Sequence, residues 1–319
     1  MRIAVSGSIA TDHLMSFAGR FSEQLLPDQL DNVSVSFLVD DLDVRRGGVA
    51  ANICFGLGIL GLRPVIVGAV GADFGEYREW LERHGVDMAG LAVSASRHTA
   101  RFVCTTDADQ NQIASFYPGA MSESAAIDLG TLGDLDLVVI SPTAPDAMVA
   151  HAAYCRNNGI PFAADPSQQL ASLEADAITA LLDGAQILFS NAYEAALLES
   201  KTGLSAEQVL AAVGTRVTTH GPDGVVIQQS GRPDLRVPVV PADTIVDPTG
   251  VGDAFRAGFL AARSWGLGLE RAAQLGSLMA TCCLESLGPQ EYTMGKTVGR
   301  ARLAAAYGED AAAEIAAHL

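Results

Sequence analysis

A glycine-rich stretch bracketed by two aspartates carries the clearest chemical signal in the sequence. It reads Asp-Pro-Thr-Gly-Val-Gly-Asp from Asp247 to Asp253 and continues into an apolar segment of helical spacing. Gly250 and Gly252 would let the backbone approach an anion, and a helix beginning near Gly252 would direct free N–H groups at it. Asp253 would then either stabilise the helix terminus or accept the proton of an attacking hydroxyl beside a bound phosphate. The paired aspartates favour the catalytic interpretation.

A second group of polar residues follows the first apolar run of the chain. Ser8 and Asp12 come directly after the run at 3–5, which predicts a short strand. A carboxylate can accept two hydrogen bonds from a vicinal diol, so Asp12 suits the 2′- and 3′-hydroxyls of a ribose. Taken alone, Asp12 would as readily cap a helix or a turn.

The elements that must position these residues follow an alternating pattern. Apolar runs bounded by Gly or Pro predict strands, and the segments between them have helical spacing, for example at 49–60 and 252–264. This alternation predicts an α/β fold, with a mostly parallel sheet sandwiched by helices and ligands at the carboxyl ends of its strands. We expect a single domain over residues 1–319, with a helical end at 303–319. The predicted strands lie at 2–5, 64–67, 135–140, 161–164, 187–189 and 225–228.

Two segments alternate apolar and polar residues instead, at 33–39 and 99–117. Strict alternation predicts half-exposed antiparallel strands, so we expect a small β-sheet lid inserted at about 12–46 and 97–118. If the second segment turns at Asp109, then Phe102 and Phe116 stand opposite each other on one face. Two such rings either pack as core or sandwich a purine, each contact being worth about 1–3 kcal/mol.

Composition limits the partners. The net charge is −17, from 20 Lys and Arg against 37 Asp and Glu, and the chain has no basic run. We therefore expect neither a nucleic-acid nor a membrane partner. The five cysteines include no C-x-x-C and predict neither a disulfide framework nor a zinc site. The chain has no signal-like start and no apolar stretch long enough for a membrane span, so we expect a cytoplasmic protein.

The glycine-rich motif resembles a signature of the ribokinase (phosphofructokinase-B) family of carbohydrate kinases. That signature reads Asp-Thr-x-Gly-Ala-Gly-Asp, and this chain differs at Val251, where a small residue is usual. The resemblance implies that Asp253 is the catalytic base and that the amides of Gly250, Val251 and Gly252 form an anion hole. It extends over nearly the whole chain, since 47–52 and 68–75 also match family motifs.

The same resemblance implies an ATP site with metal ions. Asn191 and Glu194 match an Asn-x-x-Glu element that organises Mg²⁺ through water, although the same spacing is also a capping box at a helix start. Thr219, Gly221 and Gly224 match the family's nucleotide loop, although alone they would be a turn between strands. A monovalent cation such as K⁺ would be held, as in many relatives, by Asp247, Thr249, Ser286 and Gly288.

On the acceptor side, the resemblance assigns Asp12 to the ribose diol, Gly48 to the sugar and Asn52 to a hydroxyl. Within the family, 6–13, 113–122 and 164–170 are most similar to the adenosine kinases of actinobacteria. This similarity implies phosphorylation of adenosine at its 5′-hydroxyl in purine salvage, giving AMP and ADP. A ribokinase or another sugar or nucleoside kinase is the alternative. The similarity to the adenosine kinases also implies that Phe102 and Phe116 flank adenine and that Gln168 and Gln169 lie near the ligand.

Family lids often pair across a two-fold axis, so the resemblance also implies a homodimer. The apolar stripe within 33–39 would form the contact, and Ser36 would reach the neighbouring subunit's site. Two other classes remain open from the pattern alone. A catalytically silent nucleotide-binding regulator would not need the intact Asp253, Asn191 and Glu194. A dinucleotide oxidoreductase would need a G-x-G-x-x-G after the first strand, which this chain lacks.

Overall fold

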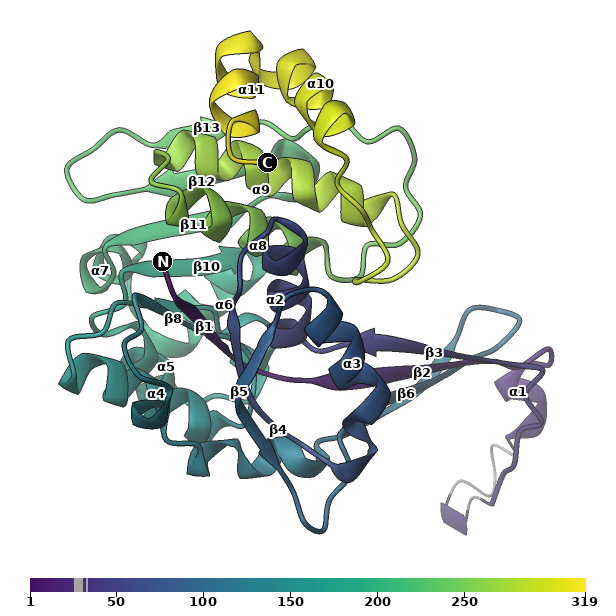
Figure 1. The fold of residues 1–319 in the computed structure, drawn as a ribbon. Coiled ribbons are helices and arrows are strands. Elements are labelled where there is room, and N and C mark those ends of the chain that lie inside the picture. Colours follow the sequence, from purple (N-terminus) through teal and green to yellow (C-terminus); the bar gives the residue numbers. More distant parts are fainter. Residues whose placement is uncertain (26–30, 33) are drawn as a thin grey trace.

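The computed structural model describes residues 1–25, 31–32 and 34–319 and is built around a nine-stranded sheet (Figure 1). The strands from β11 to β5 are parallel, and β12 and β13 continue the sheet in antiparallel fashion. In spatial order the strands are β13 (Leu235–Val237), β12 (Val225–Gln228), β11 (Thr215–Thr219), β10 (Ile187–Asn191), β9 (Phe162–Ala164), β8 (Leu137–Ile140), β1 (Ile3–Ser6), β4 (Val65–Val70) and β5 (Asp87–Val93).

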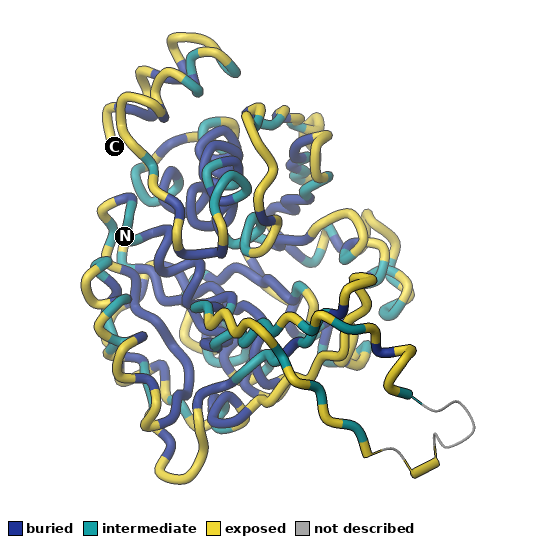
Figure 2. The backbone as a smooth tube through the Cα atoms, turned by 90° about the vertical axis from the view of Figure 1, so that its right-hand side faces the viewer, coloured by how far each residue is buried: buried dark blue, intermediate teal, exposed yellow. Residues whose placement is uncertain are grey.

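Helices cover both faces of this sheet, which confirms the predicted α/β sandwich. Successive residues of β1 enter different hydrophobic clusters, Val5 one and Ala4 the other, because side chains alternate across a strand. Figure 2 shows this buried interior in dark blue. The cluster of Val5 includes α2 (Val49–Ile59), α3 (Gly75–Arg83), α8 (Val251–Ser264) and α9 (Leu269–Leu284). The cluster of Ala4 includes α4 (Pro145–Asn157), α5 (Ala175–Leu182), α6 (Ala192–Thr202) and α7 (Ala206–Ala212).

The C-terminal segment is helical, as predicted, but it forms two helices. These are α10 (Lys296–Tyr307) and α11 (Glu309–Ala316), which join at Gly308 with φ 89°. Leu303 and Ile315 attach them to the core beside α9. Over the part of the chain that the structure describes, none of the helices has the length and apolar character that a membrane crossing requires.

A second, four-stranded sheet extends from one side of the body (Figure 1). Its order is β3 (Asp41–Gly47), β2 (Ala10–Ser16), β6 (Ala100–Thr106) and β7 (Gln112–Tyr117). We call it the lid sheet. The predicted hairpin is confirmed in its register, because Phe102 pairs with Phe116 across β6 and β7. A short helix, α1 (Phe21–Gln24), lies in the chain that connects β2 to β3.

The predicted strand at 33–39 is wrong. Val33 lies outside the described residues, and 34–39 form no strand. The strand that pairs with β2 is β3, whose register runs from Gly47 opposite Ala10 to Asp41 opposite Ser16. Residues 35, 37 and 39 are nevertheless partly buried, while 34, 36 and 38 are exposed. Alternation therefore identified an extended segment but could not identify its pairing partner.

Candidate active site

A cavity of about 660 Å³ lies between the carboxyl ends of the parallel strands and the lid sheet. Ser8 follows β1, Thr143 follows β8, Asn191 ends β10 and Thr219 ends β11, so the sheet edge brings these residues together. Most residues predicted from the sequence line this cavity. They are Ser8, Asp12, Gly48, Asn52, Phe102, Phe116, Gln168, Gln169, Asn191, Glu194, Thr219, Gly221, Thr249, Gly250, Gly252 and Asp253.

The glycine-rich loop forms the N-terminus of α8. Gly250 is the N-cap residue, with φ 76°, and a Cβ there would collide with the Cβ of Pro289, so only glycine fits. The N–H groups of Gly252 and Asp253 belong to the first turn, where no helical acceptor precedes them. The N–H of Val251 lies 3.4 Å from the carbonyl oxygen of Pro248, and Val251 is not among the lining residues. The turn can therefore bind an anion through Gly250, Gly252 and Asp253, which line the cavity, and less through Val251.

Asp253 is partly buried at the cavity wall beside this turn. Its Oδ2 accepts a hydrogen bond from Nδ2 of Asn52 at 2.8 Å. Burial raises the pKa of Asp253 to about 7, against the opposing effects of the Arg256 guanidinium and the Asn52 hydrogen bond. A carboxylate that titrates near neutrality is suited to accept a proton from a hydroxyl.

A buried ion pair beside Asp253 was not predicted from the sequence. Arg256 lines the cavity one helical turn after Asp253, and its Nη2 lies 2.6 Å from Oδ1 of Asp165. A Cβ at Gly252 would lie 2.8 Å from Nη1 of Arg256, so the guanidinium lies directly against the anion-binding turn. The available signal was an arginine within the apolar run at 254–259. Its positive charge can stabilise a phosphoryl group in transfer.

The lid sheet presents its polar and aromatic residues in one cross-strand row. Arg45 of β3 pairs with Asp12 of β2, Asp12 pairs with Phe102 of β6, and Phe102 pairs with Phe116 of β7. Directly paired residues project from the same face of a sheet. Asp12, Phe102 and Phe116 all line the cavity, so this face of the lid sheet is its roof.

Arg45 lies between two carboxylates. Burial raises the pKa of Asp12 to about 6, Arg45 opposes this shift, and the charge of Asp247 adds to it. Nη1 of Arg45 also lies 2.8 Å from Oδ2 of Asp247 and so joins the lid sheet to the glycine-rich loop.

The predicted K⁺ site does not fit the arrangement around Asp247. Its Oδ2 accepts hydrogen bonds from Arg45 and from the N–H of Gly288 at 3.1 Å, and its Oδ1 accepts one from the N–H of Thr249 at 2.9 Å. The hydroxyl of Ser286 donates to the carbonyl of Cys282 instead. Arg45 thus supplies the positive charge that a monovalent cation would bring, and neither Asp247, Ser286 nor Gly288 lines the cavity.

Asn191 and Glu194 form the capping box of α6. Oδ1 of Asn191 accepts from the N–H of Glu194 at 2.8 Å, and Oε2 of Glu194 accepts from the N–H of Asn191 at 2.8 Å. Both residues also line the cavity. In residues 1–25, 31–32 and 34–319, no cluster of three or more His, Cys, Asp and Glu is placed to hold a metal. This donor set fits an ion that keeps most of its waters and binds mainly through nucleotide phosphates, as Mg²⁺ does.

Gly224 and Ser36 are two further predicted site residues that do not line the cavity. A Cβ at Gly224, whose φ is 88°, would collide with the carbonyl oxygen of Val237, so this glycine is required by the turn between β11 and β12. Ser36 is exposed and does not line the cavity of its own chain. Gln168 and Gln169 do reach the cavity, from a 3₁₀ turn at Ser167–Ala171 whose first residue has φ 45°.

Comparison with known proteins identifies the family. The sequence pattern of the pfkB family of carbohydrate kinases matches residues 9–294. The nucleoside kinase of Methanothermobacter thermautotrophicus is 30% identical over 268 residues, which cover 82% of this chain and 86% of that protein. The adenosine kinase of Saccharomyces cerevisiae is 29% identical over only 160 residues, or 46% of this chain.

Among solved structures, the ligand-free nucleoside kinase of Burkholderia thailandensis superposes with a TM-score of 0.86 at 34% identity and covers 94% of this chain and 99% of its own. The same enzyme in complex with ADP-inosine gives a TM-score of 0.82 at 34% identity, with 96% of both chains covered. The chain therefore belongs to the pfkB (ribokinase) family of carbohydrate kinases and is a phosphotransferase.

Proposed function

We propose that this chain transfers the γ-phosphate of ATP to the 5′-hydroxyl of a purine nucleoside, with adenosine as the substrate. The observation that carries the proposal is the row of Asp12, Phe102 and Phe116 on the cavity face of the lid sheet. Neighbouring strands are about 4.8 Å apart. Across the sheet, the carboxylate of Asp12, which would bind the ribose diol, is therefore followed by the rings of Phe102 and Phe116, at a spacing that suits a ribose and its attached base. A free sugar would bind to the carboxylate of Asp12 and would not contact the two rings.

Asp253 accepts the proton of the 5′-hydroxyl as its oxygen attacks the γ-phosphorus. The new O–P bond forms while the bond to the β-phosphate oxygen breaks, and ADP leaves with the released electron pair. The N–H groups of Gly252 and Asp253 and the guanidinium of Arg256 stabilise the negative charge on the transferring group. Asn191 and Glu194 would hold Mg²⁺ through water, and the ion when bound neutralises the charge of the nucleotide phosphates.

A substrate screen with radiolabelled ATP tests the acceptor. Adenosine, guanosine, inosine, ribose and fructose 6-phosphate are compared by kcat/KM under the same conditions. We expect the nucleosides to exceed the free sugars, and adenosine to exceed the other nucleosides. Preferential phosphorylation of ribose would overturn the nucleoside assignment, while preference for inosine would overturn only adenosine. The complex of the Burkholderia nucleoside kinase with inosine makes inosine the sharpest competitor.

The base assignment has its own test. We expect Asp253→Asn to lower kcat by about 10²–10⁴ because the amide cannot accept the proton. Nucleoside binding should persist, since the asparagine can still accept the hydrogen bond of Asn52. Rapid-quench kinetics and equilibrium dialysis with labelled adenosine separate the two effects. A variant within a few-fold of wild type would remove Asp253 from the mechanism.

We also propose that the protein is a homodimer formed through its lid sheets. Support comes from the face of the lid sheet that points away from the cavity. On this face Leu42 of β3 pairs with Met15 of β2, and the same cross-strand row continues through β6 to Ile113 of β7. Leu42 and Ile113 are 58% and 46% exposed, which is unusual for large apolar side chains gathered on one face.

A further inference from the structure

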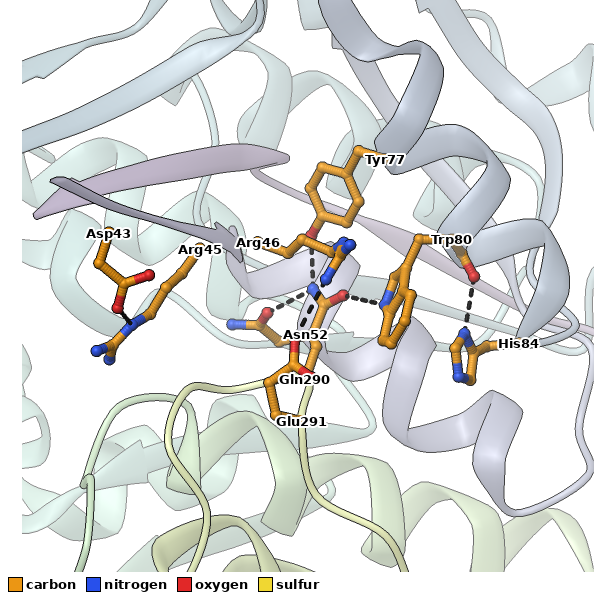
Figure 3. A network of polar contacts seen from close by, with 9 residues as sticks. All are labelled: Asp43, Arg45, Arg46, Asn52, Tyr77, Trp80, His84, Gln290 and Glu291. Carbon is orange, nitrogen blue, oxygen red and sulfur yellow. Dashed lines mark hydrogen bonds and ion pairs between the residues drawn. The ribbon is translucent and has the colours of Figure 1, made fainter.

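A chain of side-chain hydrogen bonds connects α3 to Asp253. Nε1 of Trp80 donates to Oε1 of Gln290 at 3.1 Å, and Nε2 of Gln290 donates to Oδ1 of Asn52 at 2.9 Å. Nδ2 of Asn52 then donates to Oδ2 of Asp253 at 2.8 Å. Figure 3 shows the middle of this chain, with Gln290 placed between Asn52 and the indole ring of Trp80. The four residues come from α3, the α9–α10 loop, α2 and α8, so tertiary packing alone assembles them.

The indole of Trp80 fixes the direction of every bond in this chain. An indole N–H can only donate, so the amide oxygen of Gln290 must face Trp80 and its NH₂ group must face Asn52. The oxygen of Asn52 is then committed to Gln290, and its NH₂ group is left for Asp253. Each amide has one accepting and one donating end, so reversal of either one would bring like groups together.

Tyr77 and burial reinforce this direction. The hydroxyl of Tyr77 donates to the carbonyl oxygen of Gly47 at 2.8 Å, so its oxygen is free to accept a second hydrogen bond from Nε2 of Gln290. Gln290 is 1% exposed, and Asn52 and Tyr77 are both 5% exposed. Reversal of the Gln290 amide at such depth would leave its polar groups without partners.

We infer that Trp80 and Gln290 are positioning residues for phosphoryl transfer, because they orient the amide of Asn52 so that it holds Asp253 as a carboxylate. The inference rests on the proposed function, in which Asp253 is the base. Five other titratable groups act on Asp253: Arg256 on its own helix, Asp165 after β9, Glu194 on α6, Cys283 on α9 and Tyr292 after α9. Of these, Arg256 favours the ionised form and Asp165 and Glu194 oppose it.

Two variants test the inference through the pH profile of kcat/KM. Trp80→Phe removes the N–H but keeps a ring that can pack against Phe55 and beneath Arg46, which now lie 6.1 Å and 4.0 Å away. With Tyr77 alone left to orient Gln290, the amide of Asn52 is held less firmly and can turn its oxygen toward Asp253 more often. Loss of a donated hydrogen bond raises the pKa of a carboxyl group, so the acidic limb should move up by about 0.5–1 pH unit.

Gln290→Glu keeps the length of the side chain and still accepts from Trp80, but it cannot donate to Asn52. The amide of Asn52 should therefore reverse and turn its oxygen toward Asp253. The added negative charge at position 290 also raises the pKa of Asp253. We expect the acidic limb to move by about 1 pH unit or more. If Trp80→Phe does not fold, as judged by its thermal unfolding, Gln290→Glu decides alone.

Arg46→Gln is the matched control. It removes the cation over the Trp80 ring and the 3.1 Å ion pair with Glu291 but leaves the indole N–H in place. Its pH profile should superpose on that of the wild type. The inference is overturned if both test variants lower kcat/KM by one constant factor at every pH. If Asp253→Asn remains active, the base assignment has failed; if it is inactive and the profiles of the test variants do not move, only the network has failed.

Discussion

At the scale of single residues, Asp253 shows how the group that we propose as the catalytic base can weaken the fold that holds it. Burial raises its pKa to about 7 from an ordinary value of 3.8, so between these values the folded protein binds more protons than the unfolded chain. The free energy of unfolding therefore falls as pH rises through this window. The stability that protonated Asp253 contributes is present at low pH and has been lost by pH 8.

This linkage predicts that Asp253→Asn stabilises the protein in a pH-dependent manner. The neutral amide avoids the buried charge, so its stabilising effect should be larger at pH 8 than at pH 5 by about 2 kcal/mol. Urea unfolding of wild type and variant at the two pH values measures the difference. An equal effect at both would mean that Asp253 is solvated in the folded protein.

At the scale of elements, the sequence predicted what depends on local pattern. Symmetry about Asp109 predicted that Phe102 faces Phe116, because a tight hairpin fixes its own register. Contacts between distant segments leave no comparable pattern in the sequence. Gln290 and Asn52 are 238 residues apart, and a buried glutamine looks like any surface glutamine in the sequence. The position of the glycine-rich loop at the start of a helix was therefore predictable, whereas the hydrogen bonds to its aspartate were not.

The attachment of β3 to the body gives a prediction at this scale. Arg45 lowers the pKa of Asp12 against the effect of burial, so Arg45→Ala should raise it further above 6 and protonate Asp12 near neutrality. A protonated Asp12 accepts the ribose diol less well. We expect KM for the nucleoside to rise about tenfold at pH 6.5 and less at pH 8.5.

Steady-state kinetics at the two pH values check this expectation. Glu291→Gln is the control, because it removes the neighbouring pair between β3 and the body, in which Glu291 is 52% exposed. Exposed pairs of this kind contribute about 0–1 kcal/mol, so KM should change little. A rise in KM that is independent of pH would show that Arg45 acts by holding the lid sheet and not through Asp12.

At the scale of the whole molecule, the lid sheet has two different faces. One face forms the roof of the cavity, and the other carries exposed apolar residues that nothing in the described parts of this chain covers. A sheet that projects from the body and carries exposed large apolar residues on its outer face is typical of a subunit contact. The alternating exposure of residues 34–39, next to β3, is consistent with an extended segment that a second chain would cover.

If the lid sheets form the dimer, a charge on the apolar face should separate the subunits. Leu42 is 58% exposed in the single chain, so Leu42→Glu should fold normally but disfavour a contact in which this side chain is buried. Val298→Glu on α10 is the matched control, because Val298 is equally apolar and 63% exposed but lies away from the lid sheet. Sedimentation velocity at about micromolar concentration should give dimers for wild type and Val298→Glu and monomers for Leu42→Glu, a weakening of about tenfold or more. A wild-type monomer would exclude the dimer, and a dimeric Leu42→Glu variant would place the contact on another face.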